Sequence, residues 1–177
     1  MLAIEILSAA AIETRAHQLV ALLQDAVDSG ASVGFLPPLG DQQAREYWES
    51  VRRAVEAGIR LVLAAIDGET LIGSVQLDLA AMPNARHRAE LMKLFVHRKS
   101  RRRGIARMLM GAAEEAAHAH GRTLLTADTR RGSAAEQMCI TLGYVRVGVI
   151  PRYAMSGSGT LDDTVFFYRE LPAPPAA

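Results

Sequence analysis

Hydrophobic and polar positions alternate with two different periods along the chain, and each change of period predicts a new element. Stretches with apolar residues at helical spacing predict helices, and short runs rich in branched residues predict strands. The dipeptide Asp67-Gly68 between two such runs is typical of a tight hairpin turn. The predicted elements, in order, are a strand at 4–6, helices at 8–28 and 41–57, strands at 61–66, 71–79 and 89–96, a helix at 104–120, a strand at 123–129, a helix at 133–142, and strands at 144–150 and 165–168.

This order predicts a single α/β domain over residues 1–170 with a mixed sheet of six to seven strands, followed by a loose Pro/Ala tail at 171–177. A strand, helix, strand unit in the second half of the chain favours a parallel pairing, and the hairpin favours antiparallel ones. No repeat and no linker interrupts the sequence. Its 177 residues are enough for one hydrophobic core and too few for two well-packed ones.

Composition narrows the class of protein. Half of the residues are hydrophobic, too many for a disordered chain, yet the longest apolar runs fall far short of the roughly 20 residues that a membrane helix needs. The first residues lack the basic start of a secretory signal, and the sole cysteine, Cys139, can form neither an internal disulfide nor a thiolate metal cluster. We therefore expect a cytoplasmic protein without a metal site. A net charge of +1 argues against broad nucleic-acid binding.

The densest chemical signal is the segment LFVHRKSRRRGIA at 94–106, where a predicted strand runs into a basic loop and then into a helix. A helix N-terminus presents unpaired N–H groups and the positive end of a dipole, and Gly104 lets the backbone approach a ligand closely. Together with the three arginines at 101–103, these groups predict a phosphate-binding loop. A solvated basic loop, or a contact to nucleic-acid phosphates, is the alternative for the same residues.

The Arg101-x-x-Gly104-x-Ala106 segment after a strand, the Ala-rich helix that follows it, and the passage AEQMCITLGY at 135–144 resemble the GNAT superfamily of acyl-CoA-dependent N-acetyltransferases. The order of the elements agrees with that family over the whole domain. The resemblance implies the GNAT fold, in which the sheet is splayed in the middle and helices cover both faces. Further segments are similar to the tabtoxin-resistance acetyltransferase type, namely ASVGF at 31–35, RAE at 88–90 and LLTADT at 124–129.

The resemblance also implies acetyl-CoA as the co-substrate. Backbone N–H groups of the basic loop would hold its pyrophosphate, and the exposed backbone of the preceding strand would pair with the pantetheine. An amide at the bulge of that strand would stabilise the oxyanion formed from the thioester. The side chains of the strand are equally well explained as core. The cofactor-binding residues that the resemblance implies are Leu94, Phe95, Val96, Arg101, Arg102, Arg103, Gly104, Ile105, Ala106 and Cys139.

Acyl transfer to an amine needs a proton acceptor, because an alkylammonium has no free lone pair at neutral pH. Glu90 and Asp128 are the candidate catalytic residues, since the strands that carry them can face one cleft where they diverge. Residues matching these positions are the proposed bases in the tabtoxin-resistance type. The alternative is a structural pairing with a nearby arginine such as Arg88 or Arg130. Lys93 is a second charged interruption of the strand that holds Glu90, and it also invites a functional explanation.

Many members of the family place a tyrosine in the helix at 134–142 to protonate the departing thiolate, and here that place holds Cys139. The general acid is therefore left open between Cys139, solvent, Tyr144 and Tyr153. A covalent acyl-cysteine lacks a neighbouring His or Lys that would activate the thiol. A small, buried apolar role for Cys139 is the alternative.

These features predict an acetyl-CoA-dependent N-acetyltransferase that transfers an acetyl group to the primary amine of a small molecule, such as an amino acid or an antibiotic- or toxin-like amine, by direct attack in a ternary complex. The alternative is an acyl-CoA-binding sensor without turnover, suggested by the missing tyrosine. Phe35, Tyr47 and Trp48 are candidates for the acceptor pocket and equally for the core. Neither nucleic acid nor a membrane is expected as a partner. The sequence leaves the oligomeric state open, and dimers are frequent in the family.

Overall fold

The structure, a computed structural model, describes residues 1–172. Two short 3-10 turns, at Pro83–Ala85 and Arg98–Ser100, flank the fourth strand. The helices are α1 (Ala9–Thr14), α2 (Ala16–Asp28), α3 (Asp41–Glu56), α4 (Ile105–Ala119) and α5 (Ala134–Thr141). The strands are β1 (Leu2–Ile6), β2 (Arg60–Asp67), β3 (Thr70–Leu79), β4 (Arg88–Val96), β5 (Leu124–Arg130), β6 (Val145–Met155) and β7 (Leu161–Glu170).

The strands form one mixed sheet of seven strands in the order β1-β2-β3-β4-β5-β7-β6. The junction of β4 with β5 is parallel, and the other junctions are antiparallel. α4 makes the crossover between these two parallel strands, as a parallel connection requires. The predicted α/β fold with a mixed sheet is confirmed. The sheet has seven strands, where six to seven were predicted.

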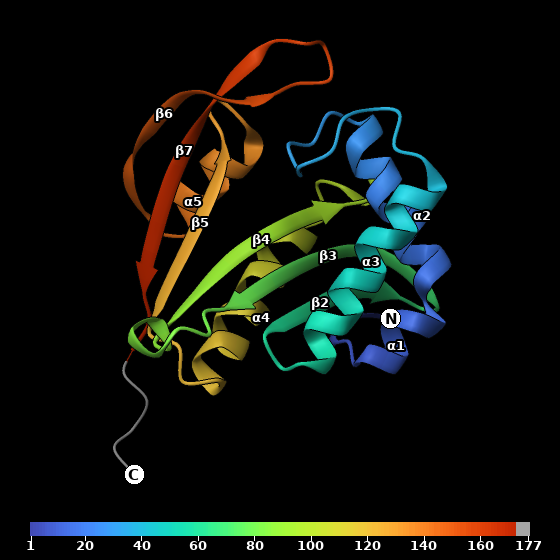
Figure 1. The fold of residues 1–177 in the computed structure, drawn as a ribbon, viewed down its shortest axis with the longest axis horizontal. Coiled ribbons are helices and arrows are strands. Elements are labelled where there is room, and N and C mark those ends of the chain that lie inside the picture. Colours follow the sequence, from blue (N-terminus) through green and yellow to red (C-terminus); the bar gives the residue numbers. More distant parts are fainter. Residues whose placement is uncertain (173–177) are drawn as a thin grey trace.

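Helices cover the two faces of the sheet unequally (Figure 1). α1, α2 and α3 pack on one face of the first four strands, around a core that includes Leu19, Leu23 and Trp48. α4 and α5 lie on the opposite face, where Leu109 and Phe167 belong to a second core. Helices therefore lie on both faces, as predicted, but the first face of β5, β7 and β6 has no helix among the described residues.

The helix predicted at 8–28 is wrong in one respect, because the structure divides it into α1 and α2 at Arg15. Arg15 has φ −96° and ψ 12°, outside the helical region, and ends α1 while starting α2. One residue earlier, the hydroxyl of Thr14 donates to the carbonyl of Ala10 at 2.9 Å, a side-chain bond that bends helices. The apolar stripe alone does not reveal such a break, since Ile12 and Leu19 are both buried.

The last two strands are longer than predicted. β6 continues past Pro151 to Met155, and β7 begins at Leu161, so that a tight turn at 156–160 joins them. A proline is tolerated there because β6 is an edge strand, where a missing N–H breaks no ladder. The pairing is irregular between Ile150 and Ala154, which accommodates the proline. The predicted loose tail at 171–177 lies outside the described residues from position 173 onward.

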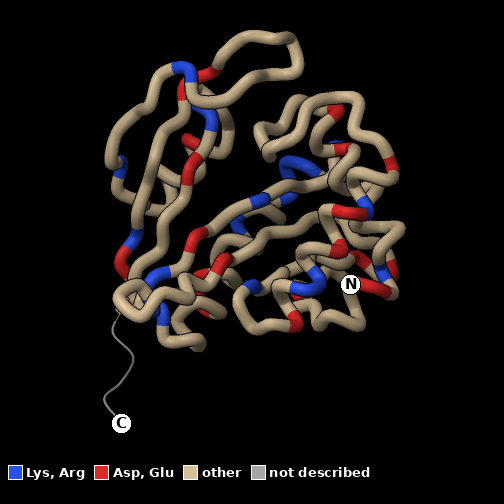
Figure 2. The backbone as a smooth tube through the Cα atoms, in the orientation of Figure 1, with Lys and Arg blue, Asp and Glu red and all other residues tan. Residues whose placement is uncertain are grey.

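None of the helices within residues 1–172 combines the length and the apolar character needed to cross a bilayer. Basic and acidic residues are spread along the described backbone and do not gather in one region (Figure 2). The same part of the chain holds no group of three or more His, Cys, Asp or Glu residues arranged to bind a metal ion.

Candidate functional site

The sheet opens between its two parallel strands. β4 and β5 pair over four residues, from Arg88 with Leu124 to Leu91 with Ala127, and then separate although both strands continue. This is the splay that the sequence predicts. Because the backbone groups of the later part of β4 have no partner on β5, this part of the strand offers free hydrogen-bonding groups to a ligand.

A β-bulge lies at the opening. On β3, Ser74 pairs with Phe95 and Gln76 pairs with Met92, so one residue of β3 opposes two residues of β4, Lys93 and Leu94. The extra residue turns the strand and redirects its side chains and amides. The predicted bulge on the strand before the basic loop is therefore present.

A cleft of about 550 Å³ starts at this opening. Gly104 closes one end of it as the N-cap of α4, with φ 76°, a conformation that glycine adopts without strain. A Cβ built on Gly104 meets no atom within 4 Å, so the space above this helix end is open. Eight of the ten predicted cofactor-binding residues line the cleft, namely Leu94, Phe95, Val96, Arg101, Arg102, Gly104, Ile105 and Ala106.

Two predicted cofactor-binding residues are placed elsewhere. Arg103 points away from the cleft and pairs with Asp67 at 2.9 Å. Cys139 lies on the buried side of α5 and belongs to the core, and its neighbour Met138 lines the cleft instead. Burial raises the pKa of the Cys139 thiol to about 11. The thiol is therefore protonated and enclosed at neutral pH.

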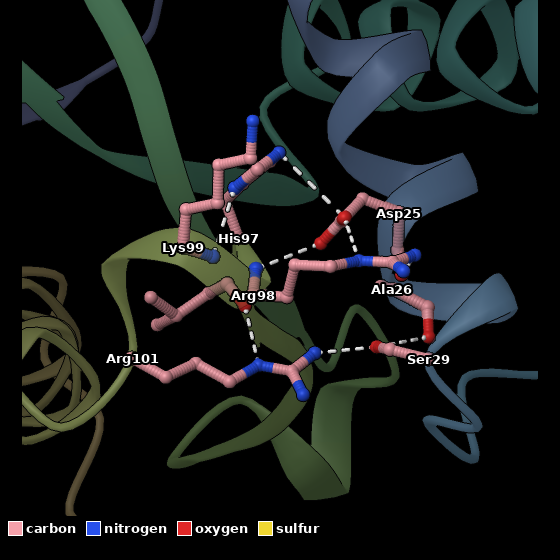
Figure 3. Close-up of polar contacts among 8 residues, drawn as sticks. Asp25, Ala26, Ser29, His97, Arg98, Lys99 and Arg101 are labelled. Carbon is pink, nitrogen blue, oxygen red and sulfur yellow. Dashed lines mark hydrogen bonds and ion pairs between the residues drawn. The ribbon is translucent and has the colours of Figure 1, made fainter.

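The basic loop is held in place by the end of α2 (Figure 3). The carboxylate of Asp25 accepts from the backbone N–H of Arg98 at 2.9 Å and also pairs with its guanidinium. Arg101 donates from Nε to the carbonyl of Val96 at 3.0 Å, and its Nη2 donates to the hydroxyl of Ser29. Part of the basic charge is thus used to fix the loop, whereas the backbone at 102–106 stays at the cleft.

Sequence reasoning missed one wall of the cleft. Residues 29–33, between α2 and α3, line it opposite the start of α5. Ser133 caps α5 by accepting from the N–H of Glu136 at 3.1 Å and also lines the cleft. Arg130, at the end of β5, lines it as well. The turn-forming residues at 29–34 indicate a loop in the sequence. Which part of the protein this loop lies against depends on the tertiary fold.

Glu90 and Asp128 lie on the same face of the sheet, the face that carries α1–α3 elsewhere. Glu90 pairs with Asp78 on β3 and with Thr126 on β5, two residues before Asp128. Burial against the sheet raises the pKa of both carboxyl groups, and the charge of Asp128 raises that of Glu90 further. The structure thus brings the two predicted bases close enough to influence each other's charge, while each stays open to solvent on one side.

Lys93 is a charged residue that acts on Asp128 and that sequence reasoning left without a role. Its Nζ donates to the carbonyl of Val33 at 2.6 Å and lies 6.0 Å from the ring centre of Phe35. Its positive charge lowers the pKa of Asp128 and so opposes the effect of burial. The interruption of an apolar strand by a lysine was the signal that could have found it.

A second cavity of about 530 Å³ adjoins the cleft and shares with it residues 30–32 and Arg130. Its walls come from the α2–α3 loop, including Phe35 and Pro37, and from the β6–β7 turn. A Cβ on Gly157 of that turn would come within 2.8 Å of Pro37, so the turn and the loop touch. The cavity therefore lies between the α2–α3 loop on one side and β5, β6 and β7 with their turn on the other.

The three aromatic candidates for an acceptor pocket have different positions. Phe35 lines the second cavity and contacts Tyr47 edge to face, with 5.2 Å between ring centres. Tyr47 donates from its hydroxyl to Oε1 of Gln76 at 3.1 Å. Trp48 is buried in the core, and its Nε1 donates to the carbonyl of Leu19 at 2.9 Å. Phe35 is thus the one of the three that faces a cavity.

Comparison with known proteins agrees with this geometry. Residues 20–144 match the family model described as the acetyltransferase (GNAT) family. An Azospirillum brasilense protein described as an uncharacterized N-acetyltransferase in the hisH-hisA intergenic region is 34% identical over 116 residues, which cover 64% of this chain and 67% of that protein.

Solved structures show the same fold at low identity. The N-acetyltransferase from Staphylococcus aureus Mu50 has a TM-score of 0.80 at 16% identity, over 97% of this chain and 99% of that one. The Salmonella typhimurium protein yncA, solved with its cofactor acetyl-CoA, has a TM-score of 0.79 at 16% identity, over 100% and 98%. The ribosomal-protein-alanine N-acetyltransferase of Brucella melitensis has a TM-score of 0.76 at 22% identity, over 96% and 99%. Since the family model spans well over half of the sequence, the chain belongs to the GNAT family of acetyltransferases.

Proposed function

We propose that the protein is an acetyl-CoA-dependent N-acetyltransferase that acetylates the primary amine of a small molecule in a ternary complex. One observation carries the proposal: the sheet opens between β4 and β5 into a cleft bordered by a helix N-terminus, and the same two strands carry the carboxylates Glu90 and Asp128, which lie outside the cleft lining. The first feature suits a phosphate-bearing donor, and the second suits a cationic acceptor.

The residues of the cleft fit coenzyme A. Backbone N–H groups at 102–106 would hold the pyrophosphate, because the αL conformations of Arg102 and Gly104 leave that backbone open at the start of α4. The unpaired part of β4 would hold the pantetheine, and a backbone amide at the bulge of Lys93 and Leu94 would face the thioester carbonyl. Bound there, acetyl-CoA supplies an activated acetyl group.

Asp128 and Glu90 would accept the ammonium proton of the acceptor, directly or through water. Their raised pKa values make each a better base than an ordinary carboxylate, provided that the pH is high enough to ionise it. The second cavity, which contacts the cleft, would hold the rest of the acceptor.

No tyrosine of α5 serves the departing thiolate. Cys139 is enclosed, and Tyr144 is buried with its hydroxyl donating to Glu114 at 3.0 Å. Burial raises the pKa of Tyr144 far above its usual value. We propose that solvent protonates the thiolate, which is a good leaving group and needs little help.

We place the protein in the tabtoxin-resistance type of the family, with an amino acid or an antibiotic- or toxin-like amine as acceptor. The resemblance of the segments at 88–90 and 124–129 supports this, because Glu90 and Asp128 match the positions of the proposed bases of that type. The second cavity adds a mixed lining, with Phe35 and Met155 beside Arg130 and Asp162, which suits a small molecule with both apolar and charged parts. Resistance to such a compound would be the biological role.

The test is a calorimetric titration of the purified protein with acetyl-CoA, which requires no knowledge of the amine. We expect one-to-one binding, and at least about a 100-fold loss in Gly104→Glu, which puts a negative charge beside the pyrophosphate. Gly111→Glu controls for the added charge, since it places the same side chain on the same helix in open space, about 10 Å further along, and Gly104→Ala controls for the strain of a Cβ at φ 76°. Equal affinity in Gly104→Glu and Gly111→Glu would contradict the proposed cleft.

Turnover is then measured as thiol release over a panel of primary amines, from amino acids to aminoglycosides. Release with any amine supports the enzyme. Tight binding without release over the whole panel would favour the acyl-CoA-binding sensor, which the cysteine at the tyrosine position suggests.

A further inference from the structure

Lys93 stands at a strained position. It has φ 54°, a left-handed backbone conformation that few residues other than glycine adopt, and it is one of the two residues of β4 that form the bulge. A strained conformation of this kind persists when the surrounding structure requires the side chain in one place. The sequence holds only two lysines, Lys93 and Lys99, among its 20 basic Lys and Arg residues.

The ammonium of Lys93 is enclosed by three consecutive residues of the α2–α3 loop. Nζ donates to the carbonyl of Val33 at 2.6 Å and lies 6.0 Å from the ring centre of Phe35. Between them, a Cβ on Gly34 would stand 3.0 Å from Nζ, and the φ of Gly34 is +86°. A compact ammonium fits this space, and glycine at position 34 leaves room for it.

These three residues form the wall between the two cavities. Val33 lines the cleft proposed for coenzyme A, whereas Gly34 and Phe35 line the second cavity. Since the contact with Lys93 joins this wall to the bulge of β4, it fixes the wall at the point where the two proposed substrates meet.

The charges around Lys93 come from three strands. Asp128 on β5 and Glu90 on β4 favour the ammonium form, while Arg60 on β2 and burial oppose it and lower the pKa of Lys93 overall. In return, Lys93 is the charge that lowers the pKa of Asp128, against the burial that raises it. The pair is therefore coupled across the opening of the sheet.

We propose that Lys93 is a positioning residue whose ammonium fixes the wall at 33–35 between the two cavities and, by its charge, favours the carboxylate form of Asp128. This inference rests on the proposed function, in which Asp128 accepts the proton of the amine. The Lys93 side chain acts through the wall and through Asp128, and touches no reacting atom.

The first experiment measures the ionisation of Asp128 directly by carboxyl ¹³C NMR, with the signal assigned by its loss in Asp128→Asn. Lys93→Met removes the charge and keeps the length, so the titration midpoint of Asp128 is expected to rise. Lys93→Arg keeps the charge and is expected to hold the midpoint near its native value. Lys99→Met, the same charge change at the exposed lysine, is the matched control. An unchanged midpoint in Lys93→Met overturns the proposal.

The second experiment measures hydrogen exchange of the backbone amides at 33–35. Loss of the bond to Val33 is expected to speed exchange about tenfold in Lys93→Met, and not in Lys99→Met. Unchanged exchange overturns the positioning role. If Lys93→Met does not fold, the native protein still gives an answer, because selective ¹³Cε labelling of lysine yields two signals. The Lys93 signal is expected to shift at the midpoint of Asp128 and to lose this step in Asp128→Asn, and the absence of any such step overturns the proposal.

A turnover measurement separates this inference from the proposed function. With an amine from the panel, kcat of Lys93→Met is expected to fall by up to about tenfold relative to Lys93→Arg below the titration midpoint of Asp128, and much less above it, because higher pH ionises Asp128 without help. If Asp128→Asn keeps full turnover while the midpoint of Asp128 still responds to Lys93, the assigned base is wrong and the coupling stands.

Discussion

The two halves of the sheet differ in what covers them. β1–β4 are packed on both faces, with α1–α3 on one side and α4 on the other, and Trp48 and Leu109 are almost fully buried. β5–β7 are covered on one face, and their outer strand β6 leaves Val147 67% exposed. The first half is a rigid frame, whereas the second leaves one face of the sheet free for a ligand. The proposed chemistry lies where they part, with Glu90 on the first half and Asp128 on the second.

The largest expected effect tests whether both halves contribute to proton transfer. Glu90→Gln and Asp128→Asn are each expected to lower turnover by about 10²- to 10⁴-fold while leaving the Kd of acetyl-CoA within about twofold, because neither side chain lines the cleft. Steady-state thiol release and calorimetry measure the two quantities. If one variant keeps the full rate, only the carboxylate on the other half of the sheet accepts the proton. If both variants keep the full rate, the base lies elsewhere.

The second largest expected effect tests the difference in packing between the two halves of the sheet. Trp48→Ala removes a buried ring and the partner of the Leu19 carbonyl, and is expected to lower the free energy of unfolding by about 3–5 kcal/mol. Val147→Ala, on the exposed edge strand, is expected to change it by less than about 0.5 kcal/mol. Urea denaturation followed by circular dichroism measures both. If both variants lose the same free energy of unfolding, the two halves of the sheet do not differ in packing.

The pH dependence of the rate compares the two carboxylates on either side of the opening of the sheet, Glu90 on β4 and Asp128 on β5. Burial raises the pKa of Glu90 and of Asp128, and the unprotonated forms accept the proton, so the rate rises with pH through a range above that of a free carboxyl group. Removing the charge of Asp128 lowers the pKa of Glu90, so the residual activity of Asp128→Asn is expected to begin at lower pH than that of the native protein. A profile of kcat/KM against pH that starts near pH 4 in the native protein would be the contrary result.

The smallest effect concerns Cys139, which belongs to the covered face. With a thiol pKa of about 11, only about one molecule in a thousand carries a thiolate at pH 8. Slow alkylation by iodoacetamide in the folded protein is therefore expected, together with turnover of Cys139→Ala within about twofold of native. A loss of turnover beyond tenfold in this variant would assign the thiol to the reaction.

The sequence was informative where the structure is local. The hairpin at Asp67-Gly68, the cap of Ser133 and the strand, basic loop and helix around Gly104 are each built from neighbours in the chain, and each is present. The break at Arg15 and the length of β6 depend on contacts that an apolar pattern does not encode.

The site was less predictable because its fixing contacts join distant residues. Lys93 and Val33 are 60 residues apart, Arg98 and Asp25 are 73 apart, and Arg103 is withdrawn to Asp67, 36 residues away. The run at 101–103 indicates a basic loop, but which arginine meets a ligand and which meets a carboxylate is decided by the tertiary fold.

The contact of the β6–β7 turn with Pro37 has a consequence for how such an enzyme can diversify. The turn at 156–158 lines the second cavity, proposed for the acceptor, and no part of the cleft proposed for the coenzyme, so substitutions there would change the shape that this cavity offers to an acceptor and leave the proposed donor site intact. The turn itself, at 156–160, contributes no residue to either core. Selection for a new acceptor therefore has a short, exposed segment to act on, at little cost in folding or in donor binding.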